Sequence, residues 1–251
     1  MPGFSGQGKV LVGTRQANGT PGLLRWLGNA GQFDLNIEED NEERNESYSG
    51  SRLPLRKLVR GRKGTITVKW DEFSKDNMAL GLIASVTTVA AAGAVAGYAF
   101  PTGAVVGNIL AVPHKNLSAV AVKDSTGVPK TLTLDTNYRL DAFAGTAELI
   151  DITTGGPYVQ PFKMDFTPGG YTKIGALNQA AQDLYVRFDG VNTDDGSRII
   201  ADIYRTRWKP LKNLVLVGDN YADFECDITV LNDPTKTASS ADGQFFSIVT
   251  P

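Results

Sequence analysis

Apolar and polar residues alternate with a period of two along the whole chain, and this feature constrains the fold most strongly. Phe33, Leu35 and Ile37 alternate with polar residues, as do Ile66, Val68 and Trp70. The same pattern recurs in KTLTLD at 130–135, PFKMDF at 161–166, LYVRFD at 184–189 and FECDITV at 224–230. Such a period indicates half-buried antiparallel strands.

Turn-forming sequences separate these segments, among them Asn18-Gly19, Asp189-Gly190 and Asp195-Gly196. Their spacing is typical of a sandwich or barrel and not of a βαβ series. No low-complexity linker divides the 251 residues, and all-β chains of this length often form one domain. We therefore predict a mainly β fold, a β-sandwich or barrel with one flanking α-helix, in a single domain over residues 1–251.

The one predicted helix begins after Ser74. The Ser74 hydroxyl can accept a hydrogen bond from a free amide of the first turn, and Asp76 adds a negative charge at the positive end of the helix dipole. Met78, Leu82 and Ile83 share one face of this helix.

A stretch without charge follows the helix, from residue 82 to residue 100, and it has the length of a membrane span. Ala and Gly dominate it, and no cluster of Lys or Arg flanks it, so no membrane span is predicted. We interpret the small-residue stretch 84–112 as a candidate insertion.

Charge and cysteine content exclude several classes of function. The formal net charge is −2, which argues against a protein that wraps nucleic acid, because neutralising phosphates requires a basic surface. Cys226 is the single cysteine, so there is no intramolecular disulfide and no thiolate metal cluster. Its neighbours predict a buried strand residue.

Each candidate motif for catalysis or cofactor binding lacks a residue or an element that its chemistry requires. The N-terminal GFSGQGKV has the G-x-x-x-x-G-K spacing of a phosphate-binding loop, but Val10 replaces the required hydroxyl and no strand precedes Gly3. His114 is the only histidine, and no G-x-S-x-G elbow accompanies it. We therefore expect no catalytic, cofactor-binding or metal site, and no enzymatic activity.

Two charged blocks of opposite sign lie close together in residues 38–63. The acidic block is Glu38, Glu39, Asp40, Glu42, Glu43 and Glu46, and the basic block is Arg52, Arg56, Lys57, Arg60, Arg62 and Lys63. One interpretation is a solvated hairpin whose arms pair with each other. The other is a projecting loop over residues 40–63 that docks on a neighbouring copy, because complementary charge fixes register and partner choice.

Several segments together resemble a known family, the major tail tube proteins of long, flexible-tailed bacteriophages. The resemblance rests on residues 4–13 with 23–35, residues 47–82, YRLDAFAGTAELID at 138–151, and residues 184–234 with 243–249. It implies a tail tube fold with long inter-subunit loops, in hexameric rings that stack into a hollow tube for DNA passage. In that family the long loop between early strands reaches an adjacent ring or subunit.

This resemblance favours the docking interpretation of the charged blocks. The inter-subunit contact residues that we predict are Glu42, Glu43, Arg52, Arg56, Lys57, Arg60 and Arg62. The implied partners are other copies of the chain and the tape measure, tail terminator and tail tip proteins. DNA would pass through the lumen without specific binding, and no membrane or cofactor is involved. The protein would be assembled in the host cytoplasm and reside in the virion.

A second interpretation is a β-sandwich module of the virion that binds a receptor or a carbohydrate. Such a module would present aromatic side chains on one face, for which Tyr138, Tyr158, Tyr171 and Tyr204 are available. An enzyme is the third alternative.

Overall fold

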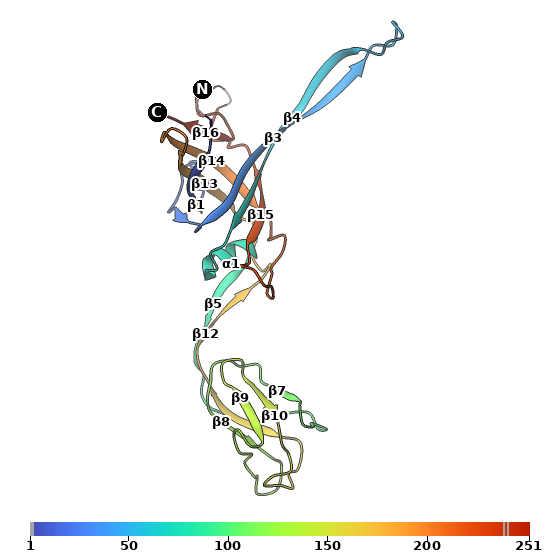
Figure 1. Cartoon of the computed structure of the whole chain (residues 1–251), viewed down its shortest axis with the longest axis vertical. Coiled ribbons are helices and arrows are strands. Elements are labelled where there is room, and N and C mark those ends of the chain that lie inside the picture. The colour runs from blue at the N-terminus through green and yellow to red at the C-terminus, as the bar shows by residue number, and fades with distance from the viewer. Residues whose placement is uncertain (1–2, 238, 240) are drawn as a thin grey trace. The chain divides into compact units, whose positions relative to one another are not determined.

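A computed structural model describes residues 3–237, 239 and 241–251 and divides the chain into two compact units (Figure 1). Unit 1 comprises Met1–Ser85 and Ile174–Pro251, and unit 2 comprises Val86–Lys173. Strands hold 48% of the residues and helix 3%, so the predicted mainly β fold with one helix is confirmed. The division differs from the single domain that the sequence predicts, because each unit has its own hydrophobic core.

Unit 1 is built on one eight-stranded antiparallel sheet with a single helix. The strands that lie wholly in unit 1 are β1 (Gly6–Thr14), β2 (Arg25–Trp26), β3 (Ala30–Asn45), β4 (Pro54–Trp70), β13 (Asp183–Asn192), β14 (Arg198–Trp208), β15 (Phe224–Val230) and β16 (Phe246–Val249). The order across the sheet is β2-β1-β13-β14-β15-β4-β3, and β16 pairs with β14. Strands β2 and β3 therefore form the two ends of this order.

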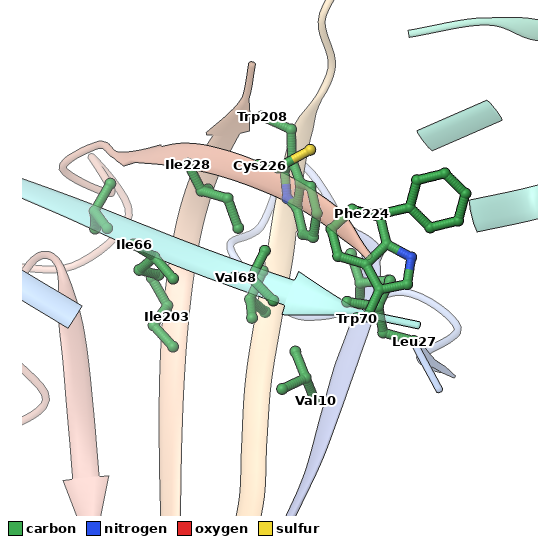
Figure 2. Packing of buried hydrophobic residues seen from close by; sticks show 13 residues of the cluster. Val10, Leu27, Ile66, Val68, Trp70, Ile203, Trp208, Phe224, Cys226 and Ile228 are labelled. Carbon is green, nitrogen blue, oxygen red and sulfur yellow. The ribbon is translucent and has the colours of Figure 1, made fainter. Parts of the chain in front are cut away.

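The core of unit 1 lies on one face of this sheet, where the alternation of the sequence predicts it. Ile66, Val68 and Trp70 of β4 are fully buried, and Val68 pairs with Phe33 on one side and with Cys226 on the other. The ring of Trp70 lies edge-on to Trp208, with 6.0 Å between the ring centroids, and Figure 2 shows Phe224 next to Trp70. Burial raises the pKa of the Cys226 thiol to about 12.

Helix α1 (Lys75–Gly81) follows β4 and begins as predicted, but it ends at Gly81. Leu82 is its C-cap and Ile83, with a φ of 46°, lies beyond it, so these two residues do not share a helix face with Met78. The Ser74 side chain accepts a hydrogen bond from the Asn77 amide, and Asp76 lies in the first turn. The buried Asn77 side chain donates to the carbonyl oxygens of Leu27 and Glu72, which holds the helix against the segments that follow β2 and β4.

No helix among the described residues has the length and hydropathy needed to cross a membrane.

Unit 2 contains two three-stranded antiparallel sheets around a second core. Its strands are β6 (Val95–Ala99), β7 (Ile109–Ala111), β8 (Leu117–Lys123), β9 (Tyr138–Asp141), β10 (Thr146–Leu149) and β11 (Lys163–Pro168). The sheet orders are β7-β10-β9 and β6-β11-β8. The core includes Phe162, Met164 and Phe166, the alternating residues of PFKMDF. Strands β5 (Ser85–Val89) and β12 (Tyr171–Gly175) form a separate two-stranded sheet where the chain passes between the units.

The small-residue stretch 84–112 is not an insertion by itself. It holds β5, β6 and β7, which pair with β12, β11 and β10 much later in the chain. The compact inserted unit therefore extends to Lys173.

The KTLTLD segment forms only isolated bridges at Thr131 and Leu134 and no continuous strand. The Thr133 amide donates to the Asn137 side chain, and the Asn137 amide donates to the Thr133 carbonyl oxygen. Asp135 has a φ of 61°, so the backbone turns where the alternation predicts an extended strand.

Candidate assembly surface on the β3–β4 hairpin

The charged blocks lie on a long β-hairpin, which is the first of the two interpretations of the sequence, and not in a loop over residues 40–63. Strands β3 and β4 pair from Ala30 and Trp70 as far as Asn45 and Pro54. Backbone pairing satisfies the amides and carbonyls of these segments whatever their side chains, so strands form without an apolar face. We call residues 38–63 the distal hairpin and residues 44–58, which include its turn, the hairpin tip.

The distal hairpin extends away from the core of unit 1. All of its residues are exposed except Glu46, which is buried in the turn, and Glu42, which is half-buried. Figure 1 shows this part of β3 and β4 as a two-stranded ribbon that extends beyond the rest of the sheet. The register shifts between Asp40 and Asn41 and again between Arg44 and Asn45, as at β-bulges, which increase local twist.

Glu46 holds the turn in shape. Its amide donates to the Leu53 carbonyl oxygen over 2.8 Å, and one carboxylate oxygen accepts from the Ser49 amide over 3.0 Å. The other carboxylate oxygen accepts from the Ser49 hydroxyl, and this bond lowers the pKa of the Glu46 carboxyl. This member of the acidic block therefore stabilises the turn.

Three of the predicted contact residues form ion pairs within the hairpin itself. Arg62 Nε lies 3.1 Å from a carboxylate oxygen of Glu39, and Arg60 pairs with Glu42. These pairs agree with the interpretation that the arms pair with each other. The arginine side chains are more than half exposed and the glutamates more than a third, so each pair contributes less than about 1 kcal/mol to stability.

The other four predicted contact residues form no ion pair among the residues that the structure describes: Glu43, Arg52, Arg56 and Lys57. Glu43 lies opposite Lys57 in the register, but Arg56 lies directly opposite Arg44. Like charges in opposite positions destabilise a strand pair. The hairpin tip thus holds positive charge that the hairpin itself does not neutralise.

Exposed apolar side chains accompany this charge, and the sequence analysis did not single them out. Leu53, Leu55 and Leu58 are each more than half exposed, and Tyr48 and Val59 are exposed as well. Leu53 and Leu55 alternate with Pro54 and Arg56, a signal that is partly hidden by the surrounding charges. Apolar side chains gathered on a projecting ribbon favour contact with another surface.

The phosphate-loop spacing at the N-terminus falls partly within strand β1. Gly8 pairs with Gly190 and Lys9 pairs with Asp189 in the register with β13. The Lys9 ammonium lies over the Trp26 ring, 5.4 Å from its centroid. A strand in this position cannot wrap a phosphate with its amides, because they pair along the sheet.

The remaining candidates for chemistry do not converge on a site. His114 is half-buried against Phe166, with 5.6 Å between the ring centroids. No group of three or more His, Cys, Asp or Glu side chains in the described parts of the chain is placed to hold a metal ion.

The tyrosines considered for a carbohydrate platform form no exposed aromatic face. Tyr138 and Tyr204 are buried, and Tyr158 and Tyr171 are half-buried. The Tyr204 hydroxyl donates to the Asp242 carbonyl oxygen over 3.0 Å. Of these four tyrosines, only Tyr158 and Tyr171 have partly accessible side chains.

Comparisons with known proteins bear on the whole chain. No curated protein matches it. One family model matches residues 3–249, which is nearly the full length and covers both units together with the hairpin. The chain therefore belongs to the family described as "Protein of unknown function UCP028589".

Proposed function

We propose that this protein is a structural subunit that assembles with other copies of itself into the tail tube of a bacteriophage. In this proposal hexameric rings stack into a hollow tube, and the tube conducts DNA into the host. The ring number and the tube come from the family resemblance of the sequence. The observation that carries the proposal is the distal hairpin, with its unneutralised charge and exposed leucines.

The distal hairpin needs a partner for physical reasons. A two-stranded hairpin alone is marginally stable in water, and this one has no core residues beneath its charged half. A neighbouring copy would cover Leu53, Leu55 and Leu58 and neutralise Arg52 and Arg56. Exposed sheet edges also favour a partner, because their unpaired backbone groups can pair with another chain and a protein rich in β-structure otherwise has to protect them.

The charge of the chain agrees with a conduit for DNA. A basic lumen would hold DNA by releasing counterions from its phosphates, whereas a chain with net charge −2 lets DNA slide. The proposed partners at the ends and inside the tube are the tail terminator, tail tip and tape measure proteins.

Negative-stain electron microscopy of the concentrated, purified protein tests this proposal. We expect rings or hollow tubes of uniform diameter, with or without tail tip components as initiators. A protein that stays monomeric under all these conditions would contradict the proposal. Binding of a defined glycan together with strict monomer behaviour would favour the receptor-binding alternative.

A further inference from the structure

The loop of residues 213–223, the second part of the connection from β14 to β15, contains a strand-forming run that has no strand partner. Leu214, Val215, Leu216 and Val217 follow one another, yet they lie outside the strands. Leu216 is 77% exposed, Val217 95% and Tyr221 99%. Side chains this apolar and this exposed, gathered in one loop, indicate an interaction surface.

The base of this loop is fixed to the sheet of unit 1. Lys212 Nζ lies 2.7 Å from Glu225 Oε1 and 2.8 Å from Asp227 Oδ1, and the Lys212 amide donates to the Glu225 carbonyl oxygen. Lys69, next to the end of β4, binds the other carboxylate oxygen of Glu225. The loop therefore starts at a defined position beside the Trp70 end of β4.

The loop is acidic as well as apolar. Asp219 and Asp223 are both exposed, and neither forms an ion pair or a side-chain hydrogen bond in the described part of the chain. No Lys or Arg occurs within residues 213–223. The loop borders a cleft of about 380 Å³, whose lining includes Val215 and Tyr221. Lys69 and Lys212 also line this cleft, and both are paired with carboxylates of β15.

The hairpin tip has the complementary composition, because it exposes leucines beside the unneutralised charges of Arg52 and Arg56. We propose that the 213–223 loop of one copy receives the hairpin tip of a second copy. Apolar side chains meet apolar side chains in this contact, and arginines meet aspartates. The inference deepens the proposed function and rests on it, since it names the surface that the hairpin engages.

The two surfaces lie at opposite ends of β4, so one chain cannot join them. From Lys69 to Pro54 the strand extends roughly 50 Å at about 3.3 Å per residue. Figure 1 shows the hairpin tip at one end of this ribbon and α1, which follows the other end of β4, far from it. A contact between different patches of two copies is heterologous, and its repetition produces rings where the rotation closes and open helical filaments where it does not.

Two charge-reversed variants of the full chain test this contact. The tip variant carries Arg52→Glu and Arg56→Glu, and the loop variant carries Asp219→Lys and Asp223→Lys. All four positions are exposed, and Arg56→Glu also replaces a like-charge pair with Arg44 by an opposite-charge pair. Both variants should therefore fold, and circular dichroism melting checks that they do.

Self-association is measured by sedimentation velocity at low salt. Each variant alone brings like charges together at the contact, so its dissociation constant should rise at least about tenfold above that of the wild type. In an equimolar mixture the contacts between the two variants attract, because the tip variant is acidic on both surfaces and the loop variant is basic on both. We expect the mixture to associate within about threefold of the wild type, and added salt to weaken this association.

A control variant with Lys130→Glu and Lys173→Glu changes the net charge as the tip variant does, but at two exposed positions of unit 2. It should associate like the wild type. The inference is overturned if the loop variant also associates like the wild type, or if the mixture associates no better than its components. If the wild type forms tubes but the mixture fails to associate, the proposed contact is refuted and the tube is not. If the mixture associates but the wild type forms no tubes, the tube is refuted and the contact is not.

Discussion

The backbone of β1 passes so close to β13 that position 8 has room only for glycine. A Cβ at Gly8 would lie 2.4 Å from the Asp189 carbonyl oxygen and 2.5 Å from the Gly190 Cα. Neither atom belongs to a flexible side chain, so the strands themselves would have to move apart. The glycine that completes the phosphate-loop spacing is thus required by strand packing.

We predict that Gly8→Ala lowers the free energy of unfolding of unit 1 by about 1–3 kcal/mol, the usual cost of adding a methyl group without space for it. Gly31→Ala is the matched control, because no atom lies within 4 Å of its added Cβ. Urea denaturation of both variants measures the difference. Equal stability of the two variants would contradict the close approach of β1 and β13.

Asp233 and Arg15 form the most deeply buried ion pair of the described chain. The Asp233 side chain is completely buried and Arg15 is 11% exposed, with 2.6 Å between Arg15 Nη2 and Asp233 Oδ1. Burial raises the pKa of the Asp233 carboxyl, but hydrogen bonds from Arg15 and Thr235 outweigh it, and the pKa falls to about 2. The ionised carboxylate is therefore the form that the fold stabilises.

The stability contributed by Asp233 should depend on pH with a defined sign. Because its pKa is lower in the folded state than in the unfolded state, the contribution is complete above the unfolded value near 3.8 and is lost as the pH falls toward 2. Asp233→Asn should cost about 3 kcal/mol at pH 7, since it leaves Arg15 buried without a counter-ion.

Chemical denaturation at pH 7 and pH 2.5 measures this dependence, and the difference from the wild type should shrink at the lower pH. The control is Asp242→Asn, which removes the more exposed pair with Lys236 and should cost less than about 1 kcal/mol. The same loss at both pH values would contradict the role of the charge.

At the scale of elements, the distal hairpin separates folding from association. Its residues contribute no side chain to the core of unit 1, so shortening it should leave that core intact. Glu43 and Lys57 lie directly opposite each other, which allows residues 44–56 to be replaced by Asn-Gly, a sequence suited to a two-residue hairpin turn.

We predict that this shortened chain unfolds within about 0.5 kcal/mol of the wild type, the range expected for changes at exposed sites. It should not self-associate, because it lacks Leu53, Leu55, Arg52 and Arg56. Thermal denaturation and sedimentation velocity measure the two effects. A shortened chain that still forms assemblies would show that the hairpin tip is dispensable.

The sequence predicts an element well where burial imposes a period on it. The alternation of Ile66, Val68 and Trp70 and the cap at Ser74 both appear in the structure as predicted. The same strand β4 continues from Lys63 back to Pro54 without that period, because both of its faces meet solvent there. Charged residues then occupy consecutive positions, and the sequence predicts a loop where the backbone pairs as a ribbon.

The sequence predicts the candidate surface only in part, for the same reason. Charge is visible in the sequence, so it indicates Arg52, Arg56 and Lys57 as contact residues. Whether an arginine is neutralised depends on the register, and only the structure places Arg56 opposite Arg44. Leu216 and Val217 lie in an apolar run that is typical of a core strand. They are exposed because this run forms a loop, which no local sequence pattern predicts.

At the scale of the whole molecule, the division into two units has no signal in composition. The chain enters and leaves unit 2 through strands β5 and β12, which pair with each other, and not through a Gly/Ser-rich or Pro-rich linker. Both segments look like ordinary strands of a larger sheet. The sequence therefore predicts one domain, although Val86–Lys173 holds a core of its own.

The pairing of β5 with β12 makes unit 2 removable. A Cβ on Gly170 would lie 3.3 Å from the Val89 carbonyl oxygen, so the end of β5 and the start of β12 are close together. A four-residue turn can therefore replace residues 90–170 and join the two strands.

Because the hairpin tip and the 213–223 loop both belong to unit 1, we predict that the protein without residues 90–170 folds and self-associates with the dissociation constant of the full chain. Sedimentation velocity compares the two proteins, and the same deletion with Arg52→Glu and Arg56→Glu is the control, which should stay monomeric. If the protein without residues 90–170 folds but remains monomeric, the assembly surface lies in unit 2. The exposed side chains of Val105, Val106 and Ile109 are then the first candidates for that surface.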